Sequence, residues 1–85
     1  MSDHYTVELR KGEVGNMTVL RTHEVKSADD ALNLIEGLRD SAQGREGVTW
    51  QSDEVDANGN LYGLANGTVY QISVVPPLSE SLLVQ

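Results

Sequence analysis

The spacing of apolar residues changes at Ser27, and this change constrains the fold more than any other feature of the chain. Before it, Tyr5, Val7 and Leu9 alternate with polar residues, which is the two-residue period of a half-buried strand. After it, apolar side chains recur at helical spacing, at Ala28, Ala31, Leu32, Ile35, Leu38 and Ala42. The chain therefore combines strands with a helix that must pack on them.

The predicted helix has a start signal and a stop signal. Ser27 is suited to be the N-cap and forms a capping box with Asp30, while Asp29 adds a second acid to the first turn, where the helix dipole favours it. Gly44 is predicted to end the helix. Because Leu34 widens the apolar stripe, we expect the helix to lie on a sheet.

Strands are predicted on both sides of this helix. Residues 4–10 and 17–25 form a first hairpin, in which Met17, Val19 and Val25 share one face. Three more strands follow the helix at roughly 48–55, 60–65 and 68–75, the last of which is ended by two prolines.

The predicted fold is therefore α+β, with the order β-β-α-β-β-β and a mainly antiparallel five-stranded sheet that carries one helix packed on one face. We assign residues 1–77 to a single compact domain. Residues 78–85 are a short C-terminal tail that is either mobile or folded over the sheet.

Glycine recurs at every fourth position in Gly59, Gly63 and Gly67, and three explanations compete for this spacing. A glycine zipper needs a long apolar helix, which the surrounding aspartate and asparagine residues exclude. A calcium loop would use four oxygen-bearing side chains, but the position of its bidentate acid is occupied by Ala65, so no metal is assigned. The four ligands of that calcium hypothesis would be Glu54, Asp56, Asn58 and Asn60.

Two tight turns explain the glycines better. Asn66-Gly67 is the sequence of a two-residue hairpin loop. Residues 57–59 fit a three-residue loop after Asp56, which pairs Val55 with Leu61. Gly63 then lies opposite Tyr70, and we predict that the tyrosine ring covers it.

This register predicts an apolar second face on the sheet. If Leu61, Tyr70, Ile72 and Val74 face the helix, then Tyr62, Leu64 and Val69 face away from it, and Trp50 joins them unless a bulge intervenes. A sheet covered on one side normally has a polar second face, so we predict a partner-binding site, for a second copy in a homodimer or for a protein partner. The predicted site consists of Trp50, Tyr62, Leu64 and Val69.

The alternative to this binding site is structural. The tail residues Leu82, Leu83 and Val84 cover the second face, or a bulge returns Trp50 to the core.

The net charge of −7 lies entirely in residues 27–85, because the acids and bases of the first 26 residues cancel. A field of this sign repels phosphate backbones, so direct nucleic-acid binding is not expected. The same charge suggests an alternative function, an acidic inhibitor that mimics nucleic acid and blocks a basic nucleic-acid-binding partner. Its acidic face would be Asp29, Asp30, Glu36 and Asp40, although a solvated helix face contains the same residues.

No pattern in the chain indicates catalysis. His4 and His23 lack metal-ligand spacing, and neither a nucleophile elbow nor a phosphate-binding loop is present in the sequence. We therefore predict a non-enzymatic protein without a cofactor. The chain has no cysteine, no signal-peptide pattern and no apolar run long enough for a membrane span, which predicts a cytoplasmic location without membrane contact.

Overall fold

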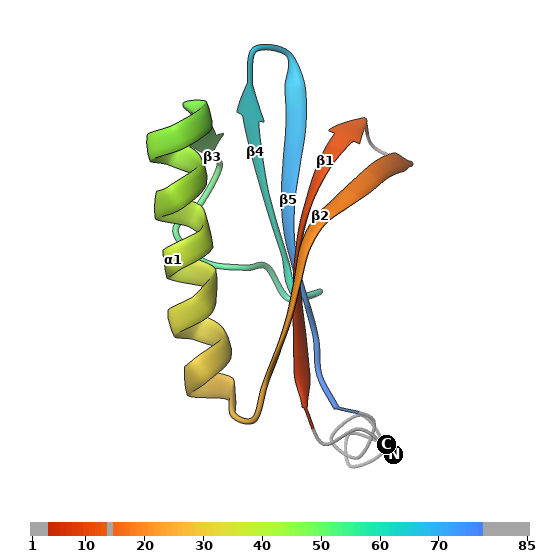
Figure 1. The fold of residues 1–85 in the computed structure, drawn as a ribbon, viewed down its shortest axis with the longest axis vertical. Coiled ribbons are helices and arrows are strands. Elements are labelled where there is room, and N and C mark those ends of the chain that lie inside the picture. The colour runs from red at the N-terminus through yellow and green to blue at the C-terminus, as the bar shows by residue number, and fades with distance from the viewer. Residues whose placement is uncertain (1–3, 14, 78–85) are drawn as a thin grey trace.

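The computed structural model describes residues 4–13 and 15–77, and Figure 1 shows how their elements are arranged. The five strands form one antiparallel sheet in the order β2-β1-β5-β4-β3, and the helix packs on one face of it, which confirms the predicted α+β fold and element order. The predicted tail, residues 78–85, lies outside the described residues. The elements are β1 Tyr5–Glu13, β2 Asn16–Val25, α1 Ala28–Glu46, β3 Thr49–Trp50, β4 Asn60–Ala65 and β5 Thr68–Val75.

Helix α1 begins as predicted and ends one turn later than predicted. The backbone N–H of Asp30 donates to Ser27 Oγ at 3.1 Å, so Ser27 is the N-cap. The helix continues through Gly44 to Glu46 and is capped by Gly47, whose φ is 69° and whose N–H donates to the Gln43 carbonyl at 3.1 Å. Ending there places Val48, which is 1% exposed, in the core, an apolar contact that commonly accompanies this type of cap.

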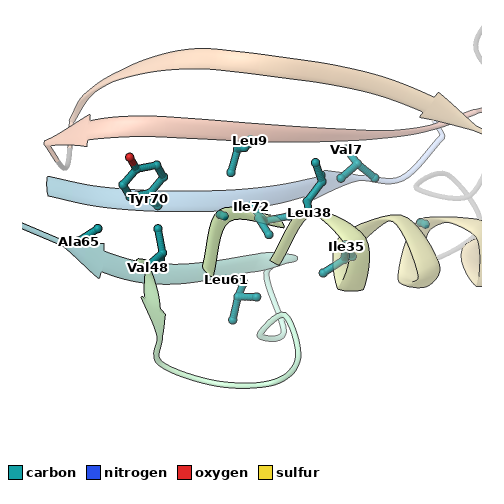
Figure 2. Packing of buried hydrophobic residues seen from close by; sticks show 11 residues of the cluster. Val7, Leu9, Ile35, Leu38, Val48, Leu61, Ala65, Tyr70 and Ile72 are labelled. Carbon is teal, nitrogen blue, oxygen red and sulfur yellow. The ribbon is translucent and has the colours of Figure 1, made fainter. Parts of the chain in front are cut away.

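The core lies between α1 and the sheet, and Figure 2 shows its side chains gathered there. The predicted inward positions Leu61, Tyr70 and Ile72 are buried, whereas Val74 is half-buried. The buried residues of the helix are three or four positions apart, as its apolar spacing predicts. The core consists of Val7, Leu9, Ala31, Ile35, Leu38, Ala42, Val48, Leu61, Ala65, Tyr70 and Ile72.

Both predicted turns are present. Asn66 and Gly67 have φ values of 52° and 79°, and Ala65 pairs with Thr68 across them, as a two-residue hairpin loop requires. In the other turn, the Gly59 N–H donates to the Asp56 carbonyl at 3.0 Å and the Asp56 N–H donates to the Asn60 carbonyl at 2.8 Å. The loop at residues 57–59 therefore has three residues, as predicted.

Strand β3 is much shorter than the predicted strand at 48–55, and this difference changes the register. Trp50 pairs with Gly63, and the Gln51 N–H donates to the Tyr62 carbonyl at 2.9 Å. The next backbone hydrogen bond joins Asp56 to Asn60. Between these two contacts, the segment after β3 advances five residues, from Gln51 to Asp56, whereas β4 advances only two, from Tyr62 to Asn60. The three extra residues are an odd number, and they reverse the face on which Trp50 lies.

Trp50 therefore covers Gly63 from the helix side of the sheet. A Cβ atom at Gly63 would lie 2.6 Å from Val48 Cγ1 and 2.7 Å from Trp50 Cε3. Tyr70 pairs with Gly63 as predicted, but the prediction that its ring covers this glycine is wrong, because the indole occupies that space. The Trp50 Nε1–H also donates to the Arg39 carbonyl of α1 at 3.0 Å.

The first hairpin contains a bulge that the sequence analysis did not predict. Leu9 pairs with Arg21 and Arg10 pairs with Val19, so Leu20 is an extra residue in β2. Beyond the bulge, Met17 and Val19 lie on the face away from α1, whereas Val25 packs against the core. The prediction that Met17, Val19 and Val25 share one face is wrong for this reason.

The packing at Gly63 gives a test of the register. We expect Gly63→Ala to lower the free energy of unfolding by about 1–3 kcal/mol, because the added methyl overlaps Val48 and Trp50. In a domain of this size, each kcal/mol lowers Tm by about 4–8 °C. Thermal unfolding followed by circular dichroism measures the change.

Gly37→Ala is the matched control for this substitution. Gly37 lies inside α1, and a Cβ atom there would meet no atom within 4 Å. We expect this variant to be more stable than the wild type by up to about 1 kcal/mol, because alanine favours the helix. Equal stability of Gly63→Ala and Gly37→Ala would contradict the packing of Trp50 on Gly63.

Candidate functional site

Helix α1 covers one face of the sheet, and the opposite face is the candidate site, which we call the open face. Its residues alternate along the strands with the buried core positions and therefore point away from α1. The strand pairing aligns them in rows that cross the sheet. The first row is Leu64, Val69, Gly12 and Met17, the second is Tyr62, Gln71, Arg10 and Val19, and the third is Asn60, Ser73, Glu8 and Thr22.

Three of the four predicted partner-binding residues meet on the open face. Tyr62 and Val69 are half-buried and Leu64 is 50% exposed, and together with Gln51 they line a shallow depression. They lie on β4 and β5, next to the two-residue loop that fixes the pairing of these strands. Their position away from the helix follows directly from the register that the loop imposes.

The fourth predicted residue, Trp50, does not belong to this group. It is half-buried, packs against the core from the helix side and donates its indole N–H to Arg39. Its predicted placement beside Tyr62, Leu64 and Val69 is wrong. The structure instead agrees with the alternative in which extra residues return Trp50 to the core, and three of them precede Asp56. The tail alternative concerns residues outside the described part of the chain.

Two apolar residues of the open face were missed by the sequence analysis. Met17 is half-buried and Val19 is 46% exposed, and the pairing of β2 with β1 places both on this face. They add apolar side chains at the β2 edge of this face, and Gly12, Arg10 and Gln71 lie between them and the group of Tyr62, Leu64 and Val69. Only the bulge at Leu20 reveals them, and alternation alone does not predict a bulge.

The centre of the open face is polar but internally hydrogen bonded. Gln71 is 7% exposed, and its Nε2 donates to Asn60 Oδ1 at 2.9 Å. Arg10 pairs with Glu8, and its Nε lies 3.0 Å from Glu8 Oε1. Among the described residues, no buried side-chain nitrogen or oxygen lacks a hydrogen-bond partner. The polar atoms that are already buried at this centre are therefore satisfied within the chain.

The charge of the chain is concentrated away from the open face. On this face, Glu8 and Arg10 cancel each other, and Glu24 lies beyond them on β2. The acidic residues between positions 29 and 56 all lie on α1 or in the segment that follows it. The open face is therefore close to neutral in a chain of net charge −7.

The four residues of the alternative acidic face are all exposed on α1. Asp29 and Asp30 lie in the first turn, where acids stabilise the helix terminus. Glu36 and Asp40 follow at positions that share the outer side of the helix with Asp29, and Asp40 Oδ1 lies 3.6 Å from Arg39 Nη2. Three of the four acids, Asp29, Asp30 and Asp40, thus already have a local interaction.

The glycine-rich turn uses its acidic side chain to cap the loop. Asp56 Oδ1 accepts hydrogen bonds from the backbone N–H groups of Asn58, at 2.8 Å, and Asn60, at 3.0 Å. This Asx arrangement explains why aspartate precedes the loop. Within residues 4–13 and 15–77, no three histidine, aspartate or glutamate side chains converge as metal ligands.

In the described part of the chain, no helix is sufficiently long and apolar to cross a membrane. Comparison of the whole chain with models of protein families, with curated proteins and with solved structures found no match.

Proposed function

We propose that the chain is a small, acidic, non-enzymatic protein-binding module that acts through its open face. The observation that carries this proposal is the apolar surface of Tyr62, Leu64 and Val69 on a sheet face that α1 leaves uncovered. A sheet of this kind normally exposes polar residues on its solvent side. Apolar patches bordered by polar residues mark interaction sites on proteins.

A second copy of the chain is the partner that we place first. Full burial of a large apolar side chain stabilises a complex by about 1.5–3 kcal/mol, and association costs roughly 4–15 kcal/mol. Three side chains that are already partly buried therefore contribute too little alone. A two-fold contact uses the same patch on both copies and adds Met17 and Val19 from each.

The distribution of charge supports the same partner. Two copies of an acidic chain repel each other wherever their acidic surfaces meet. The open face avoids this repulsion, because Glu8 and Arg10 cancel and the acids of α1 lie on the other side of the sheet. A different protein that presents a neutral apolar surface would also fit, and the proposal includes it as the other type of partner.

The test is to place a charge in the patch. We expect the mass of the wild type to rise from the monomer value of 9.3 kDa toward twice that value as concentration reaches the high micromolar range. Leu64→Asp should remain a monomer, because a carboxylate cannot be buried without a partner. Light scattering or sedimentation measures the mass of both proteins.

Leu32→Asp is the matched control for this test. Leu32 is 56% exposed on α1, and Leu64 is 50% exposed on the open face, so the two changes add the same charge at similarly exposed leucines. Leu32→Asp should associate like the wild type. If the wild type is a monomer, the two variants are instead compared by how well each captures a partner protein from native lysate. Equal behaviour of the two variants in both assays would remove the open face from the proposal.

The second candidate function is that of a nucleic-acid mimic, and one observation favours it. Asp29, Glu36 and Asp40 share the outer side of α1, with axial separations of about 10 and 6 Å at 1.5 Å per residue. Carboxylates held by a rigid helix could occupy the basic site of a nucleic-acid-binding protein. Direct binding of nucleic acid is not part of either proposal.

This second candidate predicts a strong dependence on salt and on the helix acids. We expect the double variant Glu36→Gln, Asp40→Asn to bind a basic nucleic-acid-binding protein at least about tenfold more weakly at low salt. The control double variant Asp53→Asn, Glu54→Gln removes the same charge outside the helix and should change affinity far less. Calorimetry at two salt concentrations measures both. Binding that neither salt nor the helix variant weakens would exclude mimicry.

A further inference from the structure

A second concave surface lies on the helix side of the sheet, apart from the open face. It is a groove of about 460 Å³ between the C-terminal half of α1 and the β1–β2 hairpin. Figure 1 shows that this hairpin diverges from the helix toward the end of β1. The groove borders the core at Leu9, Leu38 and Ala42, and its outer wall includes Leu20, Arg21 and Arg45.

The bulge in β2 gives the groove two adjacent side chains of different chemistry. In a regular strand, consecutive residues point to opposite faces, so only one of Leu20 and Arg21 would face the helix side. Because Leu20 is the extra residue, both side chains border the groove. Leu20 is 47% exposed, so its side chain is available for an apolar contact.

The charges at the groove favour an anion. Among the described residues, the ion pairs are Arg10 with Glu8 and Arg39 with Asp40, and neither uses Arg21 or Arg45. Glu46 is the acid that also lines the groove, so the lining carries one net positive charge. This local charge opposes the net −7 of the chain, and it matches a ligand with a single negative charge.

We propose that this groove binds an aliphatic monocarboxylate. The carboxylate lies against the guanidinium groups of Arg21 and Arg45, which can bind it in bidentate geometry. The aliphatic chain lies on Leu20 and reaches the edge of the core at Leu9 and Leu38, which are 7% and 8% exposed. The volume falls within the range of about 300–1,000 Å³ that is typical of small-ligand sites. A phosphate dianion fits less well, because Glu46 and the overall acidic field oppose a second negative charge.

The direct test is a titration of the full chain with octanoate, below its micelle-forming concentration, followed by the amide NMR signals. We expect saturable shifts at Leu20 and Ala42, with weaker binding of hexanoate and still weaker binding of butanoate. Each added methylene should strengthen binding by up to about fourfold, as expected for burial of a CH₂ group. Octanol, which has the chain without the charge, should bind at least about tenfold more weakly than octanoate.

Charge-removing variants test the two arginines. Arg21→Gln and Arg45→Gln should each weaken octanoate binding by about fivefold or more, since each removes a charge-assisted hydrogen-bond partner. Lys26→Gln is the matched control, because Lys26 is exposed, lies just beyond β2 and does not line the groove. It should bind octanoate like the wild type. Unchanged Tm values show that a loss of binding does not come from unfolding.

Three outcomes would overturn the proposal. The first is the absence of saturable shifts at Leu20 and Ala42 with millimolar octanoate. The second is that the shifts map to Leu64 and Val69, which would assign octanoate to the open face. The third is that Lys26→Gln weakens binding as much as Arg21→Gln and Arg45→Gln, which would show that only the overall charge matters.

Discussion

The contact of Trp50 with Gly63 is the constraint on which the rest of the structure depends. The indole occupies the space above the glycine, its N–H donates to the Arg39 carbonyl, and Arg39 Nη1 donates to the Asp53 carbonyl at 2.6 Å. These contacts join β3, α1 and the loop after β3. They fix the β3 end of the chain against the helix, next to Val48, which is buried in the core. The groove at Leu20 and Arg21 lies elsewhere along the helix, between its C-terminal half and the β1–β2 hairpin.

Local signals predicted the parts of the fold that local interactions determine. The Ser27 cap, the Asn66-Gly67 loop and the loop after Asp56 each depend on residues within a few positions of one another. The order of the elements follows from these signals and from the change of period at Ser27. The three predicted residues Tyr62, Leu64 and Val69 were placed correctly for the same reason, because one short loop fixes their register.

The errors arose where tertiary packing decides between two local alternatives. Gly44 and Gly47 both suit a helix end, and the burial of Val48 selects the second. Trp50 suits either face of a strand, and three extra residues in the following loop decide for the core. The bulge at Leu20 has no glycine or proline to indicate it. The assumption that side chains alternate strictly between the two faces therefore failed in both edge strands, β2 and β3. The residues near the tight turns were placed correctly.

The bulge at Leu20 connects the two candidate surfaces physically. On one side of it, Val19 pairs with Arg10 on the open face, and on the other side Arg21 pairs with Leu9 beside the groove. Without the extra residue, regular alternation would place either Met17 and Val19 or Arg21 on the opposite face. The open face would then lose part of its apolar surface, or the groove would lose a guanidinium group. One unpaired residue thus determines both the width of the neutral apolar face and the charge of the groove, on opposite sides of the same sheet.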